Sequence, residues 1–232
     1  MRGFLEALRF MTALPLGRGG SFSAAGMAQY FPLVGLTLGV ILALADALIR
    51  PLWSEPVTAG LLVFLLILLT GALQVDGLFS HRSRERILQI MKDSRIGVMG
   101  LAGVVSVLFI KWGGILDLEE GRTAALILVP AYSRGGLLLG MRFLPYGRPD
   151  GGMGTDFFQN RPGWGSFWGF GLLLPASFLL GLRGIVLVFS FAGISFLALW
   201  FLSRRIGCMT GDTLGAMNEV LEAGMFLALA AG

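Results

Sequence analysis

The chain has 232 residues, of which 55% are hydrophobic and only 14% are charged. A soluble domain carries about 25% charged residues, so this composition excludes an ordinary soluble enzyme and indicates a polytopic membrane protein. The net charge of +4 is expected to orient the chain against lipid rather than to bind nucleic acid, and one cysteine and one histidine exclude an internal disulfide and a metal site built from several histidines.

Residues 1–29 are predicted to form an N-terminal interfacial segment. We do not expect a signal peptide here, because Glu6 and Arg9 interrupt the apolar stretch that it would need. The apolar residues of this stretch share one face of a helix: Phe4, Leu5, Leu8 and Met11. We therefore expect a short amphipathic helix lying on the membrane surface, with a frayed tail as the alternative.

The apolar runs that follow predict about seven membrane spans in a single domain, residues 30–232. The spans are expected over residues 30–49, 56–75, 97–112, 123–141, 164–182, 184–203 and 214–231. The predicted fold class is therefore an all-α membrane helix bundle. Several glycines within it have the four-residue spacing that lets membrane helices approach closely: Gly35 and Gly39, Gly136 and Gly140, Gly165 and Gly169, and Gly211 and Gly215.

Basic residues are distributed unevenly over the loops between these spans. With the N-terminus in the cytoplasm, 13 of the 18 lysines and arginines fall on the cytoplasmic side: Arg2, Arg9, Arg18, Arg82, Arg84, Arg86, Lys92, Arg95, Arg142, Arg148, Arg161, Arg204 and Arg205. The outer segments carry Arg50, Lys111, Arg122 and Arg183, and the turn around Arg122 is expected to be solvated. This bias predicts a protein of the cytoplasmic (inner) membrane with its N-terminus and its polar, motif-bearing loops inside.

The polar hairpin over residues 76–95 contains a dense group of candidate site residues. Arginine binds a diphosphate through paired hydrogen bonds, and lysine offers a mobile point charge. Asp76 and Asp93 supply carboxylates that a loop binding only lipid headgroups would not need. We therefore predict a phosphate-binding site here, with a lipid-contacting loop as the alternative. Its candidate residues are Asp76, Lys92, Asp93 and Arg95 for catalysis and Arg82, Arg86 and Ser94 for substrate binding.

The last predicted span begins with a second group of polar residues. Asp212, Glu219 and Glu222 are seven and then three residues apart, so they share one face of a helix. Unpartnered carboxylates in an apolar span repel one another, and a divalent cation or an arginine from another helix would relieve this repulsion. Asn218 lies beside them. The alternative is ordinary helix packing with a protonated Glu222.

Arg134 stands in the middle of the fourth predicted span. A charge at this depth has to face the interior of the bundle and find an anion. Glu219, Glu222 and a substrate phosphate are the candidates, so a structural ion pair and a substrate contact stay equally open. Asp46, near the outer end of its span, is expected to be structural, and the loop over residues 142–163 is expected to be either a flexible polar lid or an ordinary loop.

Several short segments, in the same order along nearly the whole chain, match those of a known family. They are Leu14-Pro15, Phe31-Pro32-Leu33-Val34-Gly35, Asp76-Gly77-Leu78-Phe79, Ile90-Met91-Lys92-Asp93-Ser94-Arg95-Ile96-Gly97, Ser133-Arg134, Leu144-Pro145-Tyr146 and Thr210-Gly211-Asp212-Thr213-Leu214-Gly215-Ala216-Met217-Asn218-Glu219. On these segments the chain resembles the cobalamin synthase (adenosylcobinamide-GDP ribazoletransferase) family.

The resemblance implies a reaction in which α-ribazole, or its 5′-phosphate, attacks the diphosphate of adenosylcobinamide-GDP and GMP leaves. It implies Mg²⁺ held by Asp76, Asp93, Asp212 and Glu219. Lys92, Arg95 and Arg134 would offset the charge of the transferring phosphoryl group, a reaction that depends mostly on positioning and electrostatic stabilisation. Substrates, membrane lipids and other cobalamin assembly enzymes are the implied partners, and an oligomer is compatible with the sequence.

The chain departs from the family at one motif. The family usually has an acidic run after its first Asp-Gly, with a histidine before it, whereas this chain has a compressed run from Gln74 to Phe79 with Asp76 alone. We therefore expect a weakened metal site and reduced activity. Two rivals remain from the residues themselves: a CDP-alcohol phosphotransferase, whose spaced aspartate signature is missing, and a transporter or lipid-binding protein, which would need polar residues across the bilayer.

Overall fold

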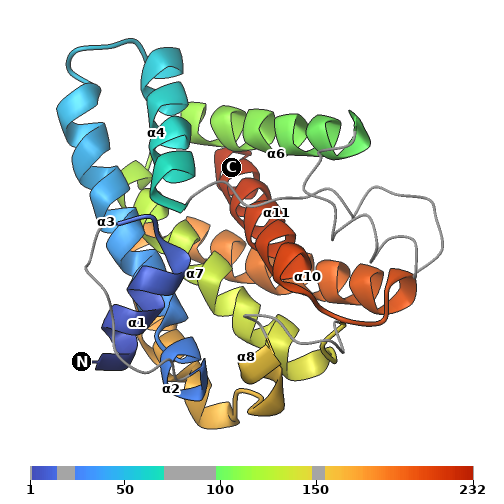
Figure 1. Ribbon diagram of the computed structural model, residues 1–232. Coiled ribbons are helices and arrows are strands. Elements are labelled where there is room, and N and C mark those ends of the chain that lie inside the picture. The colour runs from blue at the N-terminus through green and yellow to red at the C-terminus, as the bar shows by residue number, and fades with distance from the viewer. Residues whose placement is uncertain (1, 15–23, 71–97, 148–154, 232) are drawn as a thin grey trace.

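The computed structural model describes residues 2–14, 24–70, 98–147 and 155–231. Its helices are α1 (Arg2–Met11), α2 (Ala24–Ala28), α3 (Phe31–Ile49), α4 (Glu55–Thr70), α6 (Val98–Leu116), α7 (Arg122–Phe143), α8 (Thr155–Gln159), α9 (Phe170–Ala176), α10 (Leu182–Arg205) and α11 (Gly211–Ala230), with 3₁₀ turns η1 (Trp164–Gly169) and η2 (Ser177–Leu180) on either side of α9. Figure 1 shows α11 between α6 and α10. Within the described ranges the structure is helical, which confirms the all-α bundle.

Helical structure is present in each of the seven predicted spans. Three helical segments are long and apolar enough to cross a membrane: Gly26–Ile49, Arg122–Phe143 and Leu182–Arg205. Three apolar segments are shorter: Glu55–Thr70, Gly100–Leu116 and Trp164–Leu180. The last of these is a broken helix that contains Pro175, a residue that cannot donate a backbone hydrogen bond. The division into an interfacial segment and one membrane domain stays a prediction.

Helices α3 and α7 pack closely against each other at glycines. A Cβ atom at Gly35 would overlap the backbone of Pro130, and one at Gly39 would overlap the backbone of Ile127. This confirms that the four-residue glycine spacing allows close approach here. Because the residue number on α7 falls as the number on α3 rises, the two helices are antiparallel.

The second predicted glycine pair lies between α7 and α11. Gly136 faces the side chain of Leu221 and Gly140 faces that of Leu214, so α7 and α11 are also antiparallel. The other two predicted pairs, Gly165 with Gly169 and Gly211 with Gly215, do not mediate a close helix contact through both of their glycines. A Cβ atom added at Gly165 or at Gly211 would meet no described atom within 4 Å.

Helices α6 and α11, in contrast, run in the same direction. Lys111 reaches Glu219 and Glu222, and further along both helices Gly114 lies against Phe226. The directions of α3, α6, α7 and α11 are those expected if consecutive spans alternate. One end of the bundle carries the helix ends at residues 31, 70, 98, 143, 205 and 211, and we call it the loop end. The helix ends that precede and follow residues 71–97 and 206–210, and the end of α7 at Phe143, are at this end, as the alternation of spans predicts.

The N-terminal helix is present as predicted. Ala7 and Leu8 of α1 are buried, and the ring of Phe10 lies 6.3 Å from that of Phe31 and 5.2 Å from that of Phe157. Part of the apolar face of α1 therefore contacts α3 and α8 rather than lipid, and its place on the membrane surface stays a prediction. Phe157 belongs to α8, so part of the segment 142–163, expected to be a polar lid or an ordinary loop, is a short helix with a buried ring.

At the end of the bundle opposite the loop end, a buried group of charged residues around Arg122 shows that one prediction was wrong. Arg122, expected in a solvated turn, is 4% exposed. Its guanidinium donates to Asp46 at 2.9–3.1 Å and to the carbonyl oxygen of Ile115 at 2.8 Å. Glu55 lies 3.4 Å from Arg122 and 2.6 Å from Arg50. These contacts join α3, α4 and α7 and confirm that Asp46 is structural.

Candidate functional site

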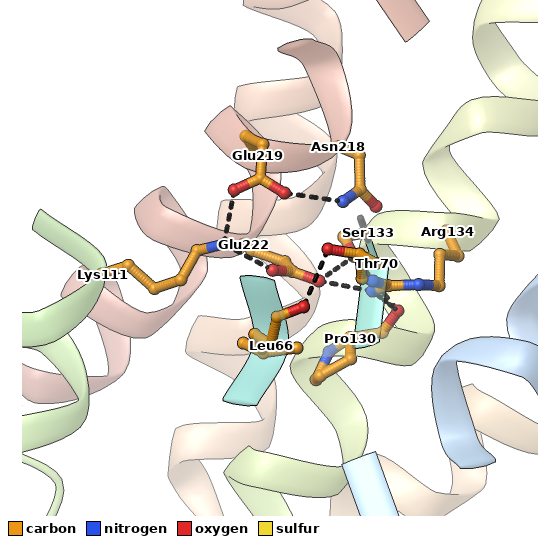
Figure 2. A network of polar contacts seen from close by, with 9 residues as sticks. All are labelled: Leu66, Thr70, Lys111, Pro130, Ser133, Arg134, Asn218, Glu219 and Glu222. Carbon is orange, nitrogen blue, oxygen red and sulfur yellow. Dashed lines mark hydrogen bonds and ion pairs between the residues drawn. The ribbon is translucent and has the colours of Figure 1, made fainter. Parts of the chain in front are cut away.

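A cluster of charged side chains lies inside the bundle, where α6, α7 and α11 meet. Its members are Lys111 of α6, Arg134 of α7, and Glu219 and Glu222 of α11 (Figure 2). Glu219 is 12% exposed, whereas the other three side chains are 1–2% exposed. Charges removed from water to this extent are tolerated only when they are paired and hydrogen-bonded.

The cluster is paired throughout. The ammonium of Lys111 donates to Oε2 of Glu219 at 2.6 Å and to Oε2 of Glu222 at 2.7 Å. Arg134 donates to Oε1 of Glu222, and Ser133 donates to the same oxygen at 3.2 Å. The four charged groups therefore form a chain of alternating sign, from Arg134 through Glu222 and Lys111 to Glu219, with no net formal charge. This balance explains how the bundle accommodates them at membrane depth.

The pairing decides among the partners left open for Arg134. Its anion is Glu222, so the structural ion pair is confirmed. Two cations contact Glu222, which excludes a protonated carboxyl packed among apolar side chains. The Nε atom of Arg134 is buried and has no hydrogen-bond partner within the described ranges.

Lys111 was assigned to an outer segment, and this is wrong. The residue lies within α6, which continues to Leu116 rather than ending at residue 112, and it is 2% exposed. A lysine inside an apolar run is costly unless an anion pairs with it, and this signal was present in the sequence. Its partners Glu219 and Glu222 are more than a hundred residues away in the chain, so spacing alone could not identify them.

The start of α11 is fixed by a reciprocal cap. Thr210 accepts a hydrogen bond from the backbone N–H of Thr213 at 3.3 Å, and the hydroxyl of Thr213 accepts one from the N–H of Thr210 at 2.7 Å. Asp212 lies in the first turn, where the helix dipole favours a negative charge. Asp212 and Glu219 thus project from one helix, both partly exposed.

Asn218 lies beside Glu219 and is almost fully buried. Its Nδ2 donates to Oε1 of Glu219 at 3.4 Å, and its Oδ1 is buried without a hydrogen-bond partner among the described atoms. A buried amide oxygen without a partner is unusual in a folded protein. The amide nitrogen of Asn218, rather than this oxygen, lies on the side of Glu219 (Figure 2).

The end of α7 is tied to the start of α11 by backbone hydrogen bonds. The N–H of Met209 donates to the carbonyl of Pro145 at 2.7 Å, and the N–H of Gly147 donates to the carbonyl of Met209 at 2.8 Å. Two segments on which the resemblance rests, Leu144–Tyr146 and Thr210–Glu219, therefore lie side by side.

A model of one family, described as cobalamin-5-phosphate synthase, matches residues 3–230 of the chain. The chain belongs to the cobalamin-5-phosphate synthase family. It is 38% identical to the adenosylcobinamide-GDP ribazoletransferase of Pseudomonas putida (strain GB-1) over the full length of both proteins. It is 36% identical to the protein of that name from Roseiflexus sp. (strain RS-1), over 94% of this chain and 85% of the relative. No solved structure matches the chain.

Much of the site predicted for this family member lies outside the described residues. These positions are Asp76, Arg82, Arg86, Lys92, Asp93, Ser94 and Arg95. The helices on either side end at Thr70 and begin at Val98, both at the loop end. Among the described residues, no group of three or more Asp, Glu, His and Cys side chains could hold a metal. The described part of the predicted metal site is Asp212 and Glu219.

Proposed function

We propose that the protein is an adenosylcobinamide-GDP ribazoletransferase. A hydroxyl oxygen of α-ribazole, or of its 5′-phosphate, forms a bond to the phosphorus that stays with the cobinamide. The bond from this phosphorus to the oxygen of GMP breaks, GMP leaves, and the hydroxyl proton is released. The observation that carries the proposal is the 38% identity over the whole of both chains to a protein of that name.

The site supports this proposal through the groups that it presents at the loop end. Asp212 and Glu219 supply carboxylates. Lys111 contacts Oε2 of Glu219, and Oε1 accepts only a 3.4 Å hydrogen bond from Asn218, which a cation bound at Oε1 would replace. Carboxylate oxygens are ligands that Mg²⁺ prefers. The ion, when bound, would neutralise charge on the diphosphate. Asp76 and Asp93 complete the proposed set.

The basic side chains of the proposed site have separate roles. Lys92 and Arg95 contact the diphosphate and stabilise the charge that develops on the transferring group. Arg134 pairs with Glu222 through one terminal nitrogen, and its proposed substrate contact is made by the remainder of the guanidinium. Arg82, Arg86, Ser94 and Asn218 bind the remaining polar groups of the two substrates.

We propose that the loop end faces the cytoplasm and that the membrane is the cytoplasmic one. The described basic residues of the loop end are Arg2, Arg9, Arg142, Arg161, Arg204 and Arg205, whereas those of the opposite end are Arg50, Arg122 and Arg183. This asymmetry supports the orientation, because cytoplasmic loops carry an excess of Lys and Arg. The site would then meet substrates made in the cytoplasm, and membrane lipids and other cobalamin assembly enzymes are its proposed neighbours.

The rival functions have less support. A CDP-alcohol phosphotransferase is disfavoured by the family to which the chain belongs. A transporter needs a polar path across the bilayer, whereas the buried charges in the described part of the bundle neutralise one another in two separate groups, around Glu222 and around Arg122.

The decisive experiment measures GMP release by the purified protein with adenosylcobinamide-GDP, α-ribazole and Mg²⁺. We expect release by the unmodified protein and its loss in Asp212→Asn, since removing a metal carboxylate costs transition-state stabilisation. The control is Asp117→Asn, which removes an exposed carboxylate at the opposite end and leaves the rate unchanged. An unmodified, folded protein that releases no GMP would refute the proposed function.

A further inference from the structure

We propose that Lys111 is a positioning residue, which holds the carboxylate of Glu219 in the orientation that the reaction requires. This inference rests on the proposed function, in which Glu219 binds the metal-diphosphate group. Lys111 touches neither substrate nor metal in this proposal and acts through Glu219 alone.

The first observation is the arrangement of oxygens around Lys111. Its ammonium lies 2.6 Å from Oε2 of Glu219 and 2.7 Å from Oε2 of Glu222. The side chain is 2% exposed, so water does not compete for these bonds, and charge-assisted hydrogen bonds of this length are among the strong ones. Lys111 is therefore held between two carboxylates at a fixed position.

The second observation is that Glu222 is itself held from another helix. Its Oε1 accepts from Arg134 and, at 3.2 Å, from Ser133. Both donors belong to α7, so Glu222 cannot turn without breaking contacts between helices. It follows that α7 fixes Glu222, that Glu222 fixes Lys111, and that Lys111 fixes Oε2 of Glu219.

The third observation concerns the end of this chain of contacts. Glu219 is its least buried member, at 12% exposure. With Oε2 bound to Lys111, Oε1 is directed to the side of Asn218, whose Nδ2 lies at 3.4 Å and whose Oδ1 has no partner among the described atoms. A glutamate without such a contact regains rotamer freedom. Lys111 thus presents one defined oxygen of Glu219 to a ligand.

The test compares Lys111→Met, Glu219→Gln and the double variant. Methionine keeps an unbranched apolar stem and removes the ammonium. We expect Lys111→Met to lower kcat by about 10–100-fold, the range found when a group that orients a metal ligand is removed. Because both residues would act as one unit, the double variant should lose no more activity than Glu219→Gln. The proposal would be overturned if the fold-loss in kcat of the double variant equalled the product of the two single losses. It would also be overturned if Lys111→Met left kcat unchanged.

Two further readouts separate positioning from a purely structural role. Lys111→Met should raise the Mg²⁺ concentration for half-maximal rate. Asp46→Asn, which breaks the buried ion pair between Asp46 and Arg122, should lower the melting temperature but leave the Mg²⁺ concentration for half-maximal rate unchanged. If Lys111→Met behaves like Asp46→Asn, Lys111 is only structural. Where Lys111→Met cannot be extracted in folded form, Lys111→Gln, which keeps a hydrogen-bond donor, replaces it with the same criteria.

A melting experiment tests the contact without any substrate. Lys111→Met leaves Glu219 without its cation, so the double variant should melt above Lys111→Met. A double variant that melts below Lys111→Met would refute the contact. Absence of GMP release by the unmodified protein refutes the proposed function, whereas normal release by Lys111→Met refutes only the role of Lys111.

Discussion

Replacing Glu222 by glutamine would remove the carboxylate that Lys111 and Arg134 share. The side-chain volume is nearly unchanged, so the perturbation is one of charge. Breaking a buried ion pair by removing one partner costs about 3–5 kcal/mol, because the remaining charge stays buried. In Glu222→Gln, Lys111 keeps Glu219 at 2.6 Å, but Arg134 loses the carboxylate that neutralises it.

The reverse substitution, Arg134→Met, is expected to cost less. Glu222 then keeps Lys111 at 2.7 Å and Ser133 at 3.2 Å, so the buried anion still has a cation. We expect a loss in the free energy of unfolding of about 5 kcal/mol for Glu222→Gln and about 3 kcal/mol for Arg134→Met, the two ends of the range for buried pairs. The double variant should lose less than the sum, since neither orphaned charge is left behind.

The assay is reversible unfolding of the purified protein in mixed micelles, followed by circular dichroism. The order of the two single variants is the critical result. If Arg134→Met is destabilised as much as Glu222→Gln, or if the double variant shows the full sum, the shared carboxylate is not the centre of the cluster.

Three other predictions follow from features described above. A cysteine introduced as Ser83→Cys should resist an impermeant thiol reagent added outside intact cells; labelling there would reverse the proposed orientation. Gly35→Ala should lower the free energy of unfolding by about 1–3 kcal/mol because its Cβ meets the backbone of Pro130. The control Gly113→Ala, whose Cβ would meet nothing within 4 Å, should not lower it. Equal unfolding curves for the two variants would contradict the close packing of α3 and α7. Inserting the family's acidic run after Gly77 should raise the rate of GMP release at limiting Mg²⁺, and an unchanged rate would mean that the existing carboxylates suffice.

The arrangement of helices could be predicted from the sequence because it depends on local properties. Apolar runs of sufficient length, separated by polar turns, predicted the places where the described residues form helices, and alternation of their directions predicted which helix ends lie together. The spacing of Gly35 and Gly39 predicted a close helix contact, although it could not identify α7 as the partner.

The pairing of charges could be predicted only in part, since it depends on contacts between distant residues. For Arg134 the sequence narrowed the anions to Glu219, Glu222 or a phosphate, and packing selects Glu222. Lys111 and Arg122 were both wrongly predicted to lie in outer segments, and for the same reason. Each stands near the apparent end of an apolar run, where a positive charge is normally solvated, and only the fold brings a carboxylate to it.

The distribution of these charges along the chain has a consequence for biogenesis. Lys111 and Arg134 are synthesised on α6 and α7, whereas both carboxylates that neutralise them are on α11, which is synthesised after these two helices. A lysine or arginine at the centre of an inserting helix costs about 2.5–3.5 kcal/mol, and this cost persists until the C-terminal helix arrives. A nascent chain that stops before residue 211 would therefore carry two uncompensated cations in the bilayer and be open to quality-control proteases. Helix α11 thus completes the electrical balance of the bundle, and we expect stable insertion of α6 and α7 to depend on its synthesis.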